Sequence, residues 1–199
     1  MSLFTPIDEA LEAYIMDDED RENEGDLIIA AEKVTSDKMA FLVRHSSGYV
    51  CAPLSTERAD ALELPYMIPN QTDRHGTAYT VTVDYEDGTT TGISAHDRAL
   101  TVTKLADPTS KPLDFMRPGH ICPLRAREGL LRTRRGHTEA SVQLCELTGQ
   151  QPAAAICELV KDDDGLMMRL DDCLKFGKKH GIKIINIDQI IEVMDRKTK

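Results

Sequence analysis

The sequence has no apolar run approaching the roughly 18 residues of a membrane-spanning helix, so we expect no transmembrane segment. Its opening residues, MSLFTP, lack the basic and apolar regions of a secretory signal peptide. The five cysteines are an odd number, and none of them belongs to a Cys-x-x-Cys pair. This usage favours reduced thiols over a disulfide framework, and we therefore expect a cytoplasmic protein.

Positive charge is also scarce, because 24 Lys and Arg residues stand against 34 Asp and Glu residues and the formal net charge is -10. Nucleic acids and anionic membranes bind basic surfaces, so the composition argues against both as partners. It does not argue against a small anionic substrate, which needs only a local basic pocket or a metal ion that offsets nearby carboxylates.

Internal repeats, Ser/Gly linkers and a strict alternation of strands and helices are absent as well, which predicts a single domain over residues 1–199. We expect an α+β fold in which helices sandwich a mixed β-sheet in three α-β-α layers. The periodicity predicts helices that start near residues 6, 36, 56, 95, 138, 171 and 188, and strands over 27–31, 49–54, 79–84, 120–125, 153–160, 166–169 and 182–187. The first helix carries the apolar stripe Ile7, Ala10, Leu11 and Tyr14, and Thr138 is expected to cap the helix that starts near it.

What the sequence has in excess is carboxylates, because seven of the ten residues 17–26 are Asp or Glu. Hard cations such as Mg²⁺ prefer oxygen ligands, so this stretch is a candidate metal site. Residues 23–26 lead straight into an apolar strand, which holds some of the carboxylates at a strand end, where sites tend to lie. The alternative is a solvated, mobile loop, which is the commoner role of a charge run.

The most basic stretch is residues 131–140, with the sequence LRTRRGHTEA. Gly136 allows a sharp turn, and a helix start with a hydroxyl from Thr138 and neighbouring guanidiniums is typical of a phosphate site. The alternative is that Thr138 only caps the helix while the arginines pair with surface acids. His137 is either a metal ligand or, as a lone histidine more often is, a structural residue.

Three single residues are weaker candidates. His120 follows Pro-Gly at a predicted strand start, which suits acid–base chemistry. Glu158 lies inside an apolar strand, where an inward side chain would have a raised pKa suited to proton transfer and an outward one would be routine. Alternation does not decide between them, because both faces of this strand look apolar. Cys51 is interpreted as a small buried apolar residue, with a reactive thiol near a site as the alternative.

Several motifs taken together resemble the 3,4-dihydroxy-2-butanone 4-phosphate synthase family of riboflavin biosynthesis. They are residues 20–27 (DRENEGDL), 45–48 (HSSG), 91–94 (TGIS), 117–121 (RPGHI) and 135–140 (RGHTEA). The resemblance spans nearly the whole chain, and residues 45–53 and 92–98 are similar to the fungal branch. The resemblance implies a Mg²⁺-dependent conversion of D-ribulose 5-phosphate to 3,4-dihydroxy-2-butanone 4-phosphate and formate. It also implies that Mn²⁺ can substitute, that two ions are present when substrate is bound, and that the protein is a homodimer with sites near the subunit interface.

The resemblance further implies roles for single residues. Glu22 and His137 would bind the metal, and substrate would contact Arg21, Glu22, Asp26, Thr77, Arg134, Arg135, Gly136, His137, Thr138 and Glu158. The phosphate would lie against residues 134–138. His120 and Glu158 would be essential for catalysis, and the proton carrier would be Glu158, His120 or Asp26, which the sequence does not rank.

One feature departs from the family pattern. An apolar strand usually lies between the first helix and the acidic loop, but a helix that reaches Tyr14 leaves only Ile15 and Met16 for it. We therefore expect this strand to be nearly absent. No second segment for GTP cyclohydrolase chemistry is recognised, so the chain is expected to be monofunctional.

Two other functions compete with the synthase. One is a metal-dependent sugar-phosphate phosphatase, which would release inorganic phosphate rather than formate. The other is a catalytically dead RNA-binding module of the same fold, which would bind RNA in a strongly salt-dependent way.

Overall fold

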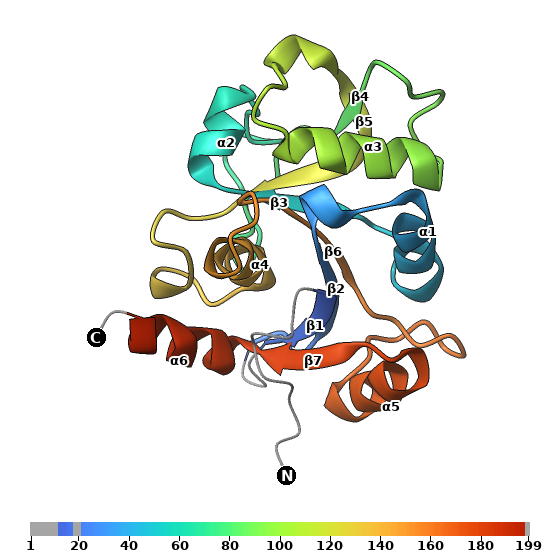
Figure 1. The fold of residues 1–199 in the computed structure, drawn as a ribbon, viewed down its shortest axis with the longest axis vertical. Helices are drawn as coiled ribbons and strands as arrows, with labels where there is room; N and C mark the ends of the chain where they lie inside the picture. The colour runs from blue at the N-terminus through green and yellow to red at the C-terminus, as the bar shows by residue number, and fades with distance from the viewer. Residues whose placement is uncertain (1–11, 18–20, 198–199) are drawn as a thin grey trace.

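The computed structural model describes residues 12–17 and 21–197 (Figure 1). The strands are β1 (Glu12–Met16), β2 (Gly25–Ala30), β3 (Cys51–Leu54), β4 (Val83–Tyr85), β5 (Phe115–Arg125), β6 (Ala154–Glu158) and β7 (Lys183–Asn186). The α-helices are α1 (Ser36–His45), α2 (Thr56–Ala61), α3 (Ala95–Ala106), α4 (His137–Leu147), α5 (Leu170–His180) and α6 (Ile187–Lys197). No helix in this described part of the chain is long and apolar enough to cross a membrane.

The strands form one sheet in the order β4-β5-β3-β6-β2-β1-β7. The pairs β1–β7 and β3–β5 are parallel, and the other neighbouring pairs are antiparallel. The sheet is therefore mixed, as the sequence predicted.

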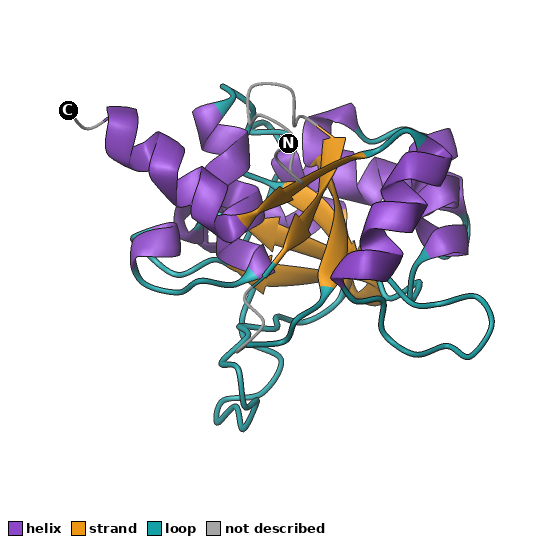
Figure 2. Cartoon of the chain, turned by 90° about the horizontal axis from the view of Figure 1, so that it is seen from below, coloured by secondary structure: helices purple, strands orange, loops and turns teal. Residues whose placement is uncertain are grey.

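Helices cover both faces of this sheet (Figures 1 and 2). Along β2, Leu27 and Ile29 belong to one buried apolar cluster, whereas Ile28 belongs to the other. The first cluster includes residues of α1, α2, α3 and α5, and the second includes residues of α4 and α6. A strand buried on both faces is apolar throughout, which explains the run at residues 27–31. The predicted three-layer α-β-α fold is confirmed.

The helix predicted to reach Tyr14 is wrong over its last residues, because Glu12–Met16 is strand β1. Its earlier part, residues 6–11, lies outside the described residues. β1 pairs antiparallel with β2, from Glu12 opposite Ile29 to Met16 opposite Gly25, and parallel with β7 on its other side. Pairing on both sides outweighs a weak helical periodicity. The strand that should precede the acidic loop is thus present, and the expectation that it is nearly absent was also wrong.

α4 begins at His137, and the extended residue Gly136 is its N-cap. The prediction that Thr138 caps this helix is therefore wrong. Thr138 and Glu139 lie in the first helical turn, and both are buried. A glycine cap leaves the first N–H groups of the helix without a capping side chain, so those groups face whatever lies beyond the helix end.

Candidate active site

The candidate site lies where β2 begins and β6 ends, beside the N-terminus of α4. The sheet register places Asp26 of β2 opposite Glu158 of β6. One cavity, on the face of the sheet that α4 covers, brings together nine predicted residues: Arg21, Glu22, Asp26, Cys51, Thr77, Arg134, His137, Thr138 and Glu158. Tyr79, Leu124 and Ile156 complete its lining. Segments far apart in the sequence therefore meet at one point.

His137 is the centre of the charged groups in this cavity. Its Nδ1 atom lies 3.5 Å from Asp26 Oδ1 and 3.7 Å from Glu22 Oε2, and its ring is buried. Burial alone would lower the pKa of His137, but the surrounding carboxylates outweigh burial and raise the pKa to about 9. Burial likewise favours neutral Glu22, yet the nearby His137 and the charge of Arg21 outweigh burial and lower the pKa of Glu22 to about 2. The site thus holds an ionised carboxylate against a basic imidazole.

Asp26 is the most deeply buried carboxyl group of the cavity, with 2% of its surface exposed. Its Oδ1 atom is buried and has no hydrogen-bond partner among the described residues. Burial, and to a smaller extent the nearby carboxylates, raise the pKa of Asp26 to about 7 against the opposing effect of His137. An orphaned buried acceptor is costly, so this oxygen is suited to a ligand hydroxyl or a cation.

The acidic loop is folded at its two ends rather than solvated. Asp17 is buried, and its carboxylate accepts hydrogen bonds from the backbone N–H groups of Glu22 (3.2 Å) and Glu24 (3.0 Å) and from Arg21 Nη1 (2.7 Å). Ligand atoms of Asp17, Glu22 and His137 lie within 4.8 Å of one another, which makes them the one such group of three among the residues described here. Asp17 was not singled out from the sequence, because β1, the strand that ends directly before this residue, was not predicted. Two carboxylates and an imidazole are a fitting donor set for a divalent cation.

Arg134 also lines the cavity, and its side chain is held by several contacts. Its Nη2 atom donates to Thr77 Oγ1 at 3.0 Å, its Nε atom donates to the carbonyl of His75 at 3.1 Å, and its Nη1 atom lies 2.5 Å from a carboxylate oxygen of Glu139. The guanidinium is therefore fixed next to Thr138 in the first turn of α4. A fixed guanidinium beside a helix N-terminus is suited to an anion such as a phosphate group.

Glu158 faces the cavity, which answers the question that alternation left open. Ile156 belongs to the apolar cluster on the α4 face, whereas Cys157 belongs to the cluster on the other face. Glu158 follows Ile156 by two residues and so shares its face. Its Oε2 atom accepts a hydrogen bond of 3.0 Å from Ser47 Oγ, a residue of the HSSG motif.

His120 does not line this cavity. It lies on β5, where its Nδ1 atom is 2.6 Å from Asp84 Oδ2 and its backbone N–H donates to Asp84 Oδ1 at 2.8 Å. Arg135 also lies outside the lining, and its Nη2 atom donates to Asp188 Oδ1 at 2.7 Å. Gly136 takes part through its backbone as the N-cap of α4. The catalytic and binding roles of all the predicted residues stay predictions, and the side chains of His120 and Arg135 lie outside the cavity lining.

Cys51 lies in the cavity floor, opposite Cys122 on the neighbouring strand. The hydrogen bond with Cys122, followed by burial, raises the pKa of the Cys51 thiol well above its usual value. A thiol in this state is a poor nucleophile, which supports the interpretation as a small buried residue.

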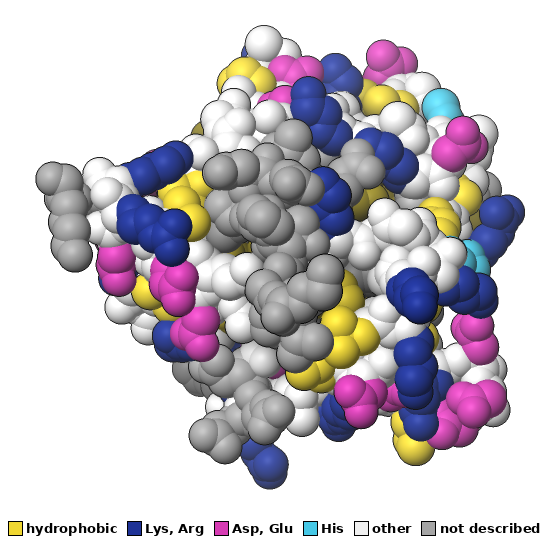
Figure 3. Space-filling view, turned by 60° about the horizontal axis from the view of Figure 1, so that its bottom comes forward, with side chains coloured by type: hydrophobic (Ala, Val, Ile, Leu, Met, Phe, Trp, Pro, Cys, Tyr) yellow, Lys and Arg dark blue, Asp and Glu magenta, His cyan; other side chains and the backbone are white. Residues whose placement is uncertain are grey.

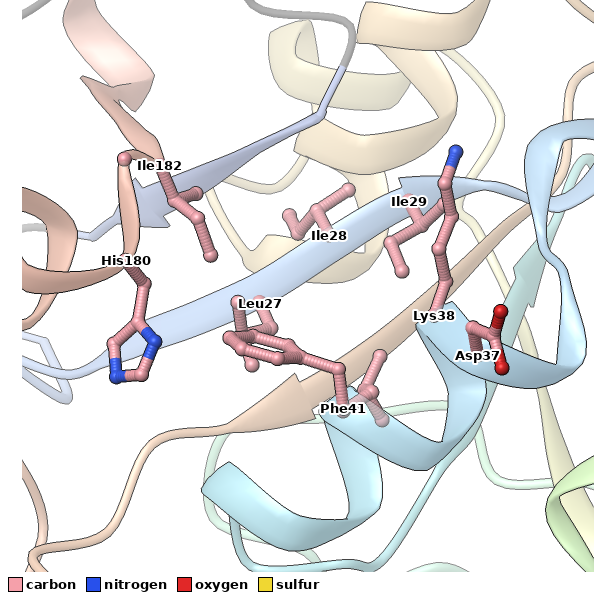
Figure 4. Close-up of a pocket in the computed structure, with 10 residues that line it drawn as sticks. Leu27, Ile28, Ile29, Asp37, Lys38, Phe41, His180 and Ile182 are labelled. Atoms are coloured by element: carbon pink, nitrogen blue, oxygen red, sulfur yellow. The ribbon is translucent and has the colours of Figure 1, made fainter.

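A different cavity, of about 370 Å³, lies on the other face of the sheet (Figure 4). Leu27 of β2, Phe41 of α1 and Ile182 line it, with Asp37, Lys38 and His180 as its polar members. Its lining holds no counterpart of the cluster around His137. The groups suited to chemistry are therefore those at the N-terminus of α4.

Comparisons of the sequence and of the fold with known proteins agree with one another. A family model described as 3,4-dihydroxy-2-butanone 4-phosphate synthase matches residues 8–193. The 3,4-dihydroxy-2-butanone 4-phosphate synthase of Candida albicans is 69% identical over 202 residues, covering 98% of this chain and 99% of that protein. The synthase of Saccharomyces cerevisiae is 57% identical over 208 residues, covering 98% and 100%. A crystal structure of a synthase in complex with two magnesium ions matches with a TM-score of 0.89 and 48% identity, covering 96% of this chain and 95% of that one.

Proposed function

The chain belongs to the 3,4-dihydroxy-2-butanone 4-phosphate synthase family, and from that premise we propose that it converts D-ribulose 5-phosphate to 3,4-dihydroxy-2-butanone 4-phosphate and formate. The observation that carries the proposal is the single cavity that Glu22, His137, Asp26 and Glu158 line together with Arg134. Carboxyl groups and an imidazole suit a sugar whose oxygens become charged, and a guanidinium suits its phosphate.

We propose that Glu22 and His137 hold Mg²⁺, for which Mn²⁺ can substitute, and that a second ion is present with substrate. The fit is supported by the donor set of Asp17, Glu22 and His137 and by the orphaned Oδ1 atom of Asp26. The ion supplies positive charge that stabilises negative charge developing on the substrate oxygens. A dense acidic loop can then face an anionic substrate.

The substrate's phosphate is proposed to lie against Arg134, Thr138 and the N–H groups of the first turn of α4. The sugar then extends toward Arg21, Asp26 and Glu158. With a pKa of about 7, Asp26 is able both to hold and to release a proton at neutral pH. Glu158, opposite it in the register, offers a second carboxyl group on the same side of the sheet.

Gly136→Ala tests the phosphate end of the cavity. A Cβ atom at residue 136 would overlap Arg134 Nη1 and lie 2.8 Å from its Cζ and 3.1 Å from Arg21 Nη2. The backbone at this residue is extended, so alanine does not strain it. We expect the KM for D-ribulose 5-phosphate to rise about tenfold, because one displaced charged contact costs about 1.5 kcal/mol. The control is Lys175→Ala, at an exposed residue of α5, and equal KM values for the two variants in steady-state kinetics would contradict the prediction.

We propose a homodimer in which His120 of the partner subunit completes the site. The support is that His120 lies outside the cavity of its own chain, while large apolar side chains are exposed around it. Ile93 is 51% exposed and Met116 is 42% exposed, and both lie close to the pair that His120 forms with Asp84. Exposed apolar groups next to a functional histidine are typical of a subunit interface.

We also propose that residues 1–199 form one synthase domain that acts in the cytoplasm, without a nucleic-acid or membrane partner. The five cysteines are all free and buried, which suits a reducing compartment. On the face drawn in Figure 3, Lys and Arg side chains are interspersed with Asp and Glu, and the net charge of the chain is -10.

The proposed function predicts that the protein with Mg²⁺ releases formate from D-ribulose 5-phosphate and that EDTA stops the release. Added Mg²⁺ or Mn²⁺ in excess of the chelator should restore the activity. Formate is measured with a coupled dehydrogenase, and inorganic phosphate is measured in the same samples. Release of phosphate without formate would identify a phosphatase instead, and turnover that ignores EDTA would refute the metal roles of Glu22 and His137.

A further inference from the structure

Glu139 is a charged residue that the proposed chemistry leaves without a role. It lies in the first turn of α4, only 1% exposed, and it does not line the cavity. A buried carboxylate is costly unless partners compensate it. One of its oxygens accepts from the backbone N–H of Arg127 at 3.1 Å, and the other lies 2.5 Å from Arg134 Nη1. Its place near the helix N-terminus also favours its negative charge.

Arg134 is held on three sides by this arrangement. A guanidinium has five N–H donors in one plane, and here three of them are engaged by Glu139, by Thr77 Oγ1 and by the carbonyl of His75. The other two N–H groups have no hydrogen-bond partner among the described residues, so they can donate to a ligand in the cavity that Arg134 lines. The three hydrogen bonds already made by the Arg134 guanidinium fix its plane, and so they fix the directions in which the other two N–H groups donate.

Glu139 also sets the position of the segment that carries Thr77. Arg127, whose N–H donates to Glu139, reaches the carbonyl of Gly76 through its Nη2 atom at 3.2 Å. Arg134 reaches His75 and Thr77 on the same segment. One buried carboxylate therefore ties together the cavity arginine and the loop that packs against it.

We propose that Glu139 is the positioning residue of phosphate binding: it holds Arg134 so that the remaining N–H groups meet the substrate's phosphate. The inference rests on the proposed function, since it assigns the residue behind a proposed phosphate contact. Arg134 and Glu139 together are neutral, so the pair supplies directed hydrogen bonds rather than net charge. Selectivity for a tetrahedral anion then depends on the orientation that Glu139 imposes.

The first test is Glu139→Gln, which preserves the shape of the side chain and removes its charge. We expect the KM for D-ribulose 5-phosphate to rise about tenfold, and the Kd of inorganic phosphate, measured by equilibrium dialysis, to rise by the same factor. The kcat should fall less than the KM rises, because groups at the sugar end are untouched. Glu146→Gln is the matched control, since Glu146 lies on the same helix, is exposed, and accepts a hydrogen bond from Gln143 at 3.3 Å.

A double-mutant cycle separates positioning from general support of the fold. In an Arg134→Ala background, Glu139→Gln should change the Kd of phosphate by less than twofold, because the group that it positions is gone. Additive effects, or a KM that stays at the wild-type value while the melting temperature falls, would overturn the proposal. Glu139→Asp keeps the negative charge but has a shorter side chain. It replaces Glu139→Gln in the phosphate-binding measurement if the glutamine variant does not fold. A wild-type phosphate Kd in Glu139→Asp would then overturn the proposal as well.

The dialysis readout also separates this inference from the proposed function. Phosphate binding that weakens in Glu139→Gln, in a protein that releases no formate, would support the inference and refute the synthase activity. Formate release by the wild type, with unchanged phosphate binding in Glu139→Gln, would support the synthase activity and refute the positioning role of Glu139.

Discussion

Glu22→Gln is expected to lower kcat/KM for D-ribulose 5-phosphate by at least about a thousandfold, or about 4 kcal/mol, and to abolish stoichiometric Mn²⁺ binding. The pKa of Glu22 is about 2, so the residue is ionised at every pH at which the enzyme would work. It lies 3.7 Å from His137 Nδ1 and belongs to the only three-ligand group in the described part of the chain. Glutamine keeps the shape but lacks the charge that a hard cation requires.

The measurement pairs formate release with Mn²⁺ binding followed by electron paramagnetic resonance. Glu192→Gln is the control, because Glu192 lies on α6 in an exposed pair with Arg196. Folding should be retained, since Glu22 is not part of either apolar cluster. If Glu22→Gln kept its Mn²⁺ affinity while losing activity, the residue would act on substrate rather than on the metal, and the ligand assignment would fail.

A strand could be predicted from the sequence where burial on both of its faces makes it apolar throughout. A strand could not be predicted where only its pairing with other strands determines its conformation. Residues 27–31 are apolar throughout because β2 is covered on both sides. The segment Glu12–Met16 carries part of a helical stripe, and only its two neighbours β2 and β7 make it a strand. β2 follows β1 closely in the sequence, whereas β7 lies near the other end of the chain. The residues around β1 therefore do not by themselves indicate that it is a strand.

Which residues line the cavity could be predicted one by one, but their supporting contacts could not. Glu22, Asp26, His137 and Glu158 were predicted because their residue types have an evident chemistry at a strand end or helix start, and the fold brings their side chains to one cavity. Glu139 was missed because an acidic residue in a first helical turn is ordinary on electrostatic grounds alone. Its proposed role depends on Arg134, which only the folded chain places 2.5 Å away.

His120 shows a limit of another kind, because its expected role and its place in one chain do not agree. The carboxylate of Asp84 can only accept in its 2.6 Å contact with Nδ1, so Nδ1 carries the hydrogen and Nε2 is left for chemistry. Asp84 is buried, whereas the His120 side chain is 41% exposed. The buried carboxylate therefore orients an imidazole that is accessible at the protein surface. That surface does not face the cavity of the same chain.

The proposed dimer therefore predicts that two inactive variants restore each other. His120→Ala and Glu22→Gln should each lose nearly all activity as homodimers. A mixture allowed to exchange subunits should recover roughly a quarter of the wild-type activity, because about half of the dimers are mixed and each mixed dimer has one intact site of two. Co-expression with two affinity tags isolates the mixed dimers, which should have roughly half of the wild-type activity. Formate release that stays at the level of the single variants would place His120 and Glu22 in the same site of one chain, and would refute the shared site.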